Sequence, residues 1–435
     1  MNTMNTRGMQ TCHFWRKGNC KRGVDCQFLH TNELNQDSTT SNDLNMKSSK
    51  STTRYAAQLT RNAGRVITII KLLSLDNLTL DTNEQIGIKD FRYVASYNLL
   101  WKKSLSILVP GSPPIWSPPT LPIKLKNDNN RTLIGGKDYK TQVSMAPVLA
   151  ALSVSITDIS ILSSTDLITD RNSLRKLLDF VNGKVDQVWK IDVEVVRNTM
   201  VFEKNAASVG RHTSNGYGFQ FEEAFLKYPK SLKGSSEHHR IATYEIGGMK
   251  WMVRFEVDGC YDAQSIEGLS QSLQNLGTSS EIEESTYKNI KILKTPTPIS
   301  DLPILEVKTA KMNSSPSRAK WMPQLYFSQT KHLIIANHKD GVFDHANIKE
   351  SDKTQDMRQW EEENQGMLRK LLQLIGTIKN IVNGIEGRKV VLLCEKGNKK
   401  HEISVLEQTR KREMIDEELI KKLWGPPAMA VSQRF

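Results

Sequence analysis

The spacing of apolar residues predicts a mixture of helices and strands over most of the chain. In residues 173–184, "SLRKLLDFVNGK", apolar positions repeat at helical spacing and stop before Gly183, a residue typical of helix ends. Residues 357–384 predict a longer amphipathic helix that ends near Gly384, and residues 413–424 predict a last helix. The apolar run in residues 388–396, "RKVVLLCEK", predicts a buried strand. Because helix and strand signals interleave, we expect an α/β or α+β fold with a large core.

Two other stretches alternate between apolar and polar residues, as strands with two different faces do. The Gly247-Gly248 pair favours a hairpin turn, and the alternation that follows it places Glu256 and Asp258 on one face of a strand. In residues 302–310, "LPILEVKTA", the same reasoning places Glu306 and Lys308 on one face. Either stretch alone is also typical of an ordinary strand whose polar face meets solvent.

Together, the two strands suggest a chemistry. Carboxylates as close as Glu256 and Asp258 repel each other unless a positive charge lies between them. Carboxylate oxygens suit magnesium or manganese, and a nearby lysine can offset negative charge that develops on a phosphate. A strand with Glu-x-Asp beside a strand with Glu-x-Lys therefore predicts a site for metal-dependent phosphodiester hydrolysis.

Composition and charge narrow the class of partner. The formal net charge is +13 and the pI is about 9.3, which favours a polyanion and nucleic acid first. The first residues, "MNTMNTRGMQ", lack the apolar core of a secretory signal, and no stretch approaches the length of a membrane span. We expect an intracellular protein without a membrane partner, nuclear or cytoplasmic, with basic clusters such as "KGNKKHE" slightly favouring the nucleus.

Three of the five cysteines lie within the first 30 residues, and their spacing indicates zinc rather than disulfides. With one histidine they form the pattern C-x7-C-x5-C-x3-H, whose members are Cys12, Cys20, Cys26 and His30. Three thiolates and one imidazole make a closed tetrahedral structural site, and a segment this small depends on the metal for its fold. We therefore predict a zinc-finger domain at 1–31, a flexible Ser/Thr/Asn-rich linker at 32–53 and one large domain at 54–435.

Residues between the zinc ligands suggest what the finger binds. Aromatic and basic residues alternate there, and such side chains stack on unpaired bases and meet phosphates; they are Phe14, Trp15, Arg16, Lys17 and Phe28. The segment resembles the CCCH zinc-finger family, whose members often bind single-stranded RNA. A protein-binding finger is the alternative.

Four short motifs in a fixed order carry a second resemblance. "GFQFE" at 218–222 matches a G-Φ-x-Φ-E motif (Φ is apolar), and "EVD" at 256–258 and "EVK" at 306–308 match E-Φ-D and E-Φ-K. Gln324 follows a Lys-Trp pair, as does a later glutamine of the same family. This set resembles the DXO-type RNA 5′-end decapping nucleases over about residues 90–340.

The resemblance implies a fold and a set of site residues. The fold is PD-(D/E)XK-like, with a mixed central sheet flanked by helices. The implied catalytic residues are Glu222, Glu256, Asp258, Glu306, Lys308 and Gln324, and the first four would bind Mg²⁺ or Mn²⁺. Glu223 is an alternative to Glu222, and Arg171 is a candidate for an arginine that the family carries upstream. Pro323 favours a helix that starts close to Gln324.

Two functional hypotheses follow from these patterns. The first is a metal-dependent hydrolase of RNA 5′ ends, acting in decapping or pyrophosphate release with or without 5′-to-3′ degradation, and helped by an RNA-binding finger. The second is a catalytically inactive RNA-binding or adaptor protein. No GxxxxGK[ST] loop and no GxGxxG fingerprint is present, which argues against P-loop and dinucleotide-binding enzymes. We interpret "SSEHHRIA", with His238 and His239, as a surface loop rather than a metal pair.

Overall fold

A computed structural model describes the larger part of the chain. The described residues are 61–75, 84–100, 105–129, 145–204, 216–229, 232, 234–261, 282–296, 298–299, 301–395, 401–410 and 413–426. The chain divides into two units, Met1–Arg54 and Tyr55–Phe435, and all described residues lie in the second. The predicted finger and linker lie outside the described residues, so their boundaries stay predictions.

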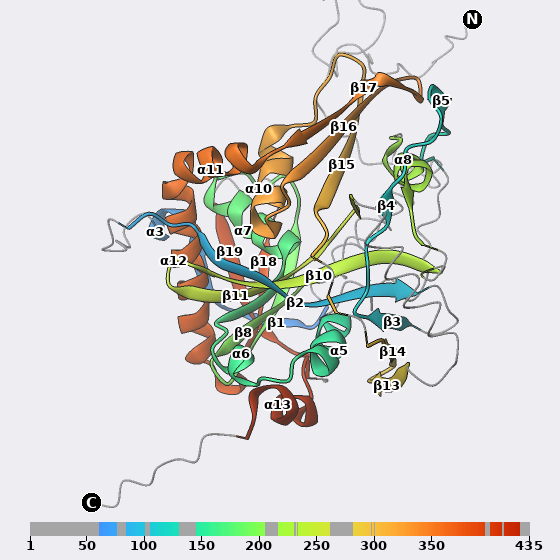
Figure 1. Ribbon diagram of the computed structural model, residues 1–435. Coiled ribbons are helices and arrows are strands. Elements are labelled where there is room, and N and C mark those ends of the chain that lie inside the picture. The colour runs from blue at the N-terminus through green and yellow to red at the C-terminus, as the bar shows by residue number, and fades with distance from the viewer. Residues whose placement is uncertain are drawn as a thin grey trace, which may run out of the picture. The chain divides into compact units, whose positions relative to one another are not determined.

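The described residues form two mixed sheets (Figure 1). Their strands run mostly antiparallel, with parallel pairs such as β6 beside β11 and β15 beside β16. In spatial order, the twelve described strands of the larger sheet are β1 (Ala63–Lys71), β19 (Glu402–Gln408), β18 (Lys389–Cys394), β7 (Trp189–Val196), β8 (Thr199–Lys204), β6 (Leu167–Asp170), β11 (Met249–Glu256), β10 (Ser235–Ile246), β2 (Ile88–Leu100), β3 (Ser106–Val109), β14 (Ile290–Lys294) and β13 (Glu283–Tyr287). The seven described strands of the smaller sheet are β5 (Ile123–Lys124), β17 (Val342–Asp352), β16 (His332–Lys339), β15 (Ile304–Lys311), β12 (Gly259–Cys260), β4 (Ile115–Trp116) and β9 (Leu226–Lys227).

Helices cover both faces of the larger sheet. The described helices are α3 (Leu72–Leu75), α5 (Ala146–Ser155), α6 (Ser160–Ser163), α7 (Arg171–Val181), α8 (Gly218–Phe225), α10 (Arg318–Ser328), α11 (Thr354–Glu363), α12 (Gln365–Asn383) and α13 (Glu417–Trp424). Side chains of α7, α10 and α12 pack in one apolar cluster with Trp251 of β11, while α5 and α13 share a second cluster with its neighbour Met252. Successive strand residues point to opposite faces, so these clusters lie on opposite sides of the sheet. The expected mixed central sheet flanked by helices is confirmed.

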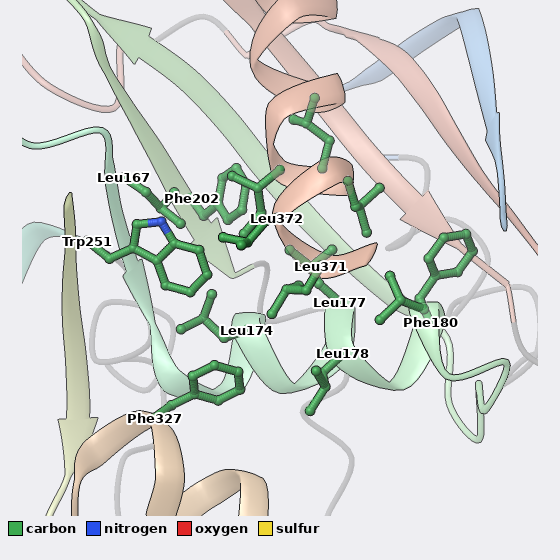
Figure 2. Packing of buried hydrophobic residues seen from close by; sticks show 14 of the residues in the cluster. Leu167, Leu174, Leu177, Leu178, Phe180, Phe202, Trp251, Phe327, Leu371 and Leu372 are labelled. Carbon is green, nitrogen blue, oxygen red and sulfur yellow. The ribbon is translucent and has the colours of Figure 1, made fainter. Parts of the chain in front are cut away.

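The first of these clusters shows how the helical pattern is used (Figure 2). Leu174 and Leu177 of α7 lie near Leu371 and Leu372 of α12, and Leu178 belongs to the same cluster. All five side chains are buried, and full burial of a leucine contributes roughly 1.5–3 kcal/mol. The helix predicted in residues 173–184 is therefore confirmed as α7, and Gly183 follows it with φ of 68°.

Most other predicted elements are also confirmed, with one correction. The hairpin joins β10 to β11, the buried strand is β18 and the last helix is α13. The single helix predicted in residues 357–384 is wrong, because α11 ends and α12 begins at Asn364. There the Asn364 Nδ2 donates to the carbonyl of Trp360 at 2.7 Å, and such side-chain bonds to the backbone compete with helix continuation. No helix in the described part of the chain is long and apolar enough to cross a membrane.

One connection sets up the site. The chain leaves the larger sheet at Glu256, the last residue of β11, and enters the smaller sheet at Gly259, the first residue of β12. Because β12 pairs with β15 at Leu305, the residue Asp258 comes beside the strand that carries Glu306. The two predicted acidic strands therefore meet where the two sheets join.

Candidate active site

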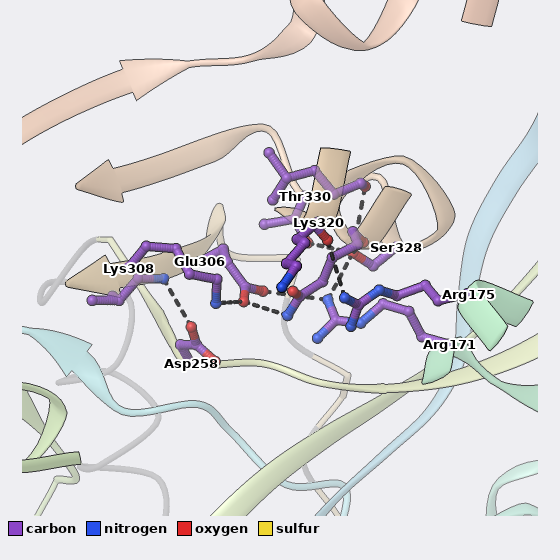
Figure 3. A network of polar contacts seen from close by, with 11 residues as sticks. Arg171, Arg175, Asp258, Glu306, Lys308, Lys320, Ser328 and Thr330 are labelled. Atoms are coloured by element: carbon purple, nitrogen blue, oxygen red, sulfur yellow. Dashed lines mark hydrogen bonds and ion pairs between the residues drawn. The ribbon is translucent and has the colours of Figure 1, made fainter. Parts of the chain in front are cut away.

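Glu306 is the centre of a polar cluster drawn from three elements (Figure 3). It lies on β15 with 1% of its surface exposed, and its Oε1 accepts hydrogen bonds from Lys308 Nζ and from Gln324 Nε2 of α10. Arg171 Nη1, from the first residue of α7, lies 3.4 Å from Glu306 Oε2. The structure thus brings together three predicted residues and the candidate arginine.

Local capping explains how Arg171 reaches this position. Asp170 is the N-cap of α7, and its Oδ1 accepts the backbone N–H of Ser173 at 2.9 Å, a typical way to fix the first helical turn. Arg171 Nη1 also donates to Ser328 Oγ at 3.1 Å, at the end of α10. The guanidinium is therefore held between Ser328, at the end of α10, and Glu306 on β15.

The other predicted carboxylates line a cavity of about 410 Å³. Glu222 comes from α8, Glu256 from the end of β11 and Asp258 from the crossing between the sheets. Asp258 Oδ2 accepts the backbone N–H of Val307 at 2.8 Å, which ties this crossing to β15. Four carboxylates from separate parts of the sequence therefore converge around the junction of the two sheets.

The charges of these carboxylates are not balanced within the protein. Glu256 is exposed at the end of β11, yet partial removal from water, together with the negative charges of Glu237 and Asp258, raises its pKa to about 8. Removal from water and the negative charge of Glu306 raise the pKa of Asp258 to about 6. The pKa of Glu222 is well above its ordinary value because of burial and then Asp258 and Glu256. All three groups are harder to ionise than free carboxylic acids, as expected for like charges held together.

Glu306 behaves in the opposite way. Burial alone would raise its pKa, but the positive charges of Lys308 and Arg171 outweigh burial and hold the pKa below its ordinary value. Burial alone would lower the pKa of Lys308, but Glu306 and Asp258 raise it. Glu306 and Lys308 are therefore an ion pair, whereas the positive charges near the other three carboxyls do not outweigh burial and the neighbouring negative charges.

This donor set fits a hard divalent cation. Carboxylate oxygens are the ligands that Mg²⁺ and Mn²⁺ prefer, and a bound cation would favour the ionised forms of Glu222, Glu256 and Asp258, whose pKa values burial and neighbouring negative charges raise. Among the described residues, no group of three or more acidic, histidine or cysteine side chains is already gathered closely enough to hold an ion. Glu306 instead faces Lys308 and Gln324.

The structure bears on two details of the predicted motifs, and the first differs from expectation. The helix that carries Gln324 starts at Arg318, so Pro323 lies inside α10 rather than in its first turn. Gln324 nevertheless points at Glu306. Glu223 is exposed on α8 and accepts a hydrogen bond from Gln220 Nε2 at 3.3 Å, whereas the charge interactions of Glu222 are with the other site carboxylates. This arrangement favours Glu222 as the member of the set.

The interpretation of "SSEHHRIA" as a surface loop is wrong. His238 and His239 are buried residues of β10, where alternation sends them to opposite faces of the sheet. His239 stacks on Tyr97 with ring centroids 4.9 Å apart, and its Nε2 lies 3.1 Å from Glu237 Oε2. Glu237 itself lines the cavity. Sequence reasoning missed it because only the pairing of His239 with Glu256 across two strands brings Glu237 near the other acids.

The comparisons with known proteins agree with this architecture. A family model described as Domain of unknown function (DUF8563) matches residues 69–424, and one for zinc fingers of "C-x8-C-x5-C-x3-H type (and similar)" matches residues 7–31. No curated protein has a sequence that matches the chain significantly.

Solved structures show the same fold. S. pombe Rai1 has a TM-score of 0.52 at 14% identity, covering 78% of this chain and 99% of its own. Candida albicans Rai1 in complex with pU5-Mn²⁺ has a TM-score of 0.51 at 13% identity, covering 78% and 96%. Scheffersomyces stipitis Rai1 in complex with (3′-NADP)⁺ and calcium ion has a TM-score of 0.50 at 12% identity, covering 80% and 98%. The expected decapping-nuclease fold and the CCCH finger are therefore confirmed, while the roles of individual residues stay predictions.

Proposed function

This chain belongs to the family described as Domain of unknown function (DUF8563), and from that premise we propose that it is a metal-dependent hydrolase of RNA 5′ ends. The observation that carries the proposal is the convergence of Glu222, Glu256 and Asp258 beside the Glu306–Lys308 ion pair. A merely structural cluster would be expected to neutralise its charges internally, whereas this one leaves three carboxyls with raised pKa values.

Each residue has a role that its environment supports. The four carboxylates would hold Mg²⁺ or Mn²⁺, which when bound polarises a phosphate and acidifies a water molecule. Lys308 would offset negative charge on the phosphate, and Gln324 would orient the water or the phosphate through its amide. Arg171 keeps Glu306 ionised and in place. The Rai1 complexes with pU5-Mn²⁺ and with a dinucleotide and calcium support a nucleotide and a divalent ion in this fold.

The finger would contribute affinity rather than chemistry. Zinc bound by Cys12, Cys20, Cys26 and His30 would order the segment, and its exposed aromatic and basic residues would bind single-stranded RNA. The positive charge of the chain supports such a partner. Basic clusters favour action in the nucleus.

The test is hydrolysis of a panel of RNAs by the full zinc-loaded chain with Mg²⁺, with Mn²⁺ and with EDTA. The panel carries a 5′ triphosphate, an unmethylated cap, a methylated cap or a nucleotide-type cap. We expect metal-dependent release of the 5′ group from at least one of them. Glu222→Gln should reduce the rate at least about a hundredfold, and Glu223→Gln, its neighbour on α8, should not.

The alternative function predicts a different outcome. An inactive adaptor would bind RNA and hydrolyse none of the panel with either metal. Wild-type protein with that behaviour would refute the enzyme proposal.

A further inference from the structure

The cavity lined by Glu222, Glu256 and Asp258 also contains side chains of a different chemistry. Phe219 lines it with 39% of its surface exposed, although large apolar side chains are usually buried. Phe219 and Glu222 are three residues apart on α8 and therefore lie on one side of the helix. An aromatic face thus stands one helical turn from a predicted metal ligand.

The position of Phe219 is fixed by the backbone. Asp128 is buried, and its two carboxylate oxygens accept the N–H groups of Phe219 at 3.4 Å and Gln220 at 3.1 Å. A carboxylate at a helix N-terminus satisfies N–H groups that lack helical partners. The first turn of α8 is held in place, so the exposed ring is a prepared surface rather than a loose side chain.

Glu237 supplies a polar group to the same cavity. Its carboxylate lines the cavity and is 34% exposed, while His239 Nε2 holds it from behind at 3.1 Å. An ionised carboxylate only accepts hydrogen bonds, so it repels phosphate and needs a donor from the ligand. With one oxygen already engaged by a histidine, Glu237 is less suited to a metal than the four carboxylates discussed above.

We propose that Phe219 and Glu237 form a ribonucleoside subsite beside the metal-binding carboxylates. The base of one nucleotide stacks on Phe219, and the 2′-hydroxyl of that same nucleotide donates a hydrogen bond to Glu237. The inference rests on the proposed function, because RNA must enter this cavity. Stacking tolerates any base, and every ribonucleotide has a 2′-hydroxyl. Both contacts therefore suit a protein that acts on RNA ends of varied sequence.

The experiment replaces single nucleotides of the RNA and asks whether each residue senses one position. Otherwise identical RNAs carry one 2′-deoxy or one abasic nucleotide at the first, second or third position. Binding to the full zinc-loaded chain is measured in Ca²⁺ by fluorescence anisotropy, and hydrolysis is measured in Mn²⁺. For the wild type, we expect one position at which either change weakens binding by about tenfold or more, since a stacked base or a hydrogen bond to a charged group contributes on that scale.

The variants then assign the contacts. In Glu237→Ala, the 2′-deoxy change at that position should lose its effect while the abasic change keeps it. In Phe219→Ala the reverse is expected, and Phe219→Trp should restore the abasic sensitivity. Thermal unfolding checks that each variant is folded, and Phe219→Leu replaces Phe219→Ala if the smaller side chain unfolds α8.

The outcomes separate this inference from the proposed function. Sensitivity that is unchanged in the variants, or that lies at different positions for sugar and base, overturns the subsite. If the wild-type protein shows position-dependent binding but hydrolyses none of the RNAs, the enzyme proposal is refuted and the subsite stands.

Discussion

Neutralising two different carboxylates should have the same effect on activity and opposite effects on stability. Glu306→Gln and Glu256→Gln change almost no volume, and each removes a predicted metal ligand. Hydrolysis should fall at least about a hundredfold in both, the scale of losing one preorganised electrostatic contact. The stability of the metal-free protein should distinguish them, because their charge environments differ.

For Glu306→Gln, the structure predicts destabilisation. Glu306 is buried, and its charge compensates Lys308 and Arg171. Removing one partner of a buried ion pair costs about 3–5 kcal/mol, and the partial exposure of Lys308 lowers our expectation to about 2–4 kcal/mol. We therefore expect this substitution to lower stability as well as activity, although it preserves the volume of the side chain.

For Glu256→Gln, the sign is reversed. The pKa of about 8 means that ionised Glu256 is unfavourable in the metal-free fold at pH 8.5. The neutral amide removes that repulsion, so the metal-free protein should be at least as stable as the wild type. Glu284→Gln on β13, an exposed partner of Lys291, is the control and should change neither property measurably.

The assay is urea unfolding in EDTA at pH 8.5, alongside turnover in Mn²⁺. A loss of stability for Glu256→Gln as large as that for Glu306→Gln would refute the reasoning. So would unchanged stability of Glu306→Gln, because the ion pair with Lys308 and Arg171 would then contribute nothing.

Three further predictions test other parts of the chain. Folding raises the pKa of Asp258 to about 6 and that of Glu256 to about 8, so the stability of the metal-free protein should fall as pH rises from about 4 through 8. The increase in Tm caused by Mn²⁺ should grow over the same pH range. An increase in Tm that does not depend on pH would contradict the proposed site. Arg410→Met should reduce the free energy of unfolding by about 2–4 kcal/mol, because buried Glu203 loses its cation, and a change under about 0.5 kcal/mol in urea unfolding would contradict this. Removing zinc should weaken RNA binding and leave saturated turnover unchanged, as measured after mild chelation; a large fall in saturated turnover would place the finger in the active site.

The acidic strands could be predicted because local patterns determine them. Alternation along residues 249–258 and 302–310, joined to the turn signal at Gly247, was enough to pair carboxylates on strand faces. The alternative, an ordinary strand whose polar face meets solvent, does not hold at every position, since Arg254 of β11 and Glu306 of β15 are both buried. For Arg254 the reason is that helices cover both faces of the larger sheet, and for Glu306 it is that Lys308, Gln324 and Arg171 close around it; alternation reveals neither.

Features that depend on contacts between distant segments could not be predicted in this way. Glu237 comes near Glu256 only through the register of β10 with β11. Arg171 reaches Glu306 only because α7 begins beside α10. Likewise, the break at Asn364 depends on hydrogen bonds that compete with a strong helical pattern. Periodicity identifies elements, but their docking decides which polar residues share a site.

The charge distribution of the site is unfavourable for folding without a cation. Lys308 and Arg171 form ion pairs with Glu306 and also act on Asp258, yet the pKa values of Glu222, Glu256 and Asp258 stay raised. A protein selected only for stability would replace such residues, because each ionised carboxyl works against folding. A bound doubly charged cation would offset this cost, because it stabilises the ionised carboxylates against the desolvation and the mutual repulsion that raise their pKa values.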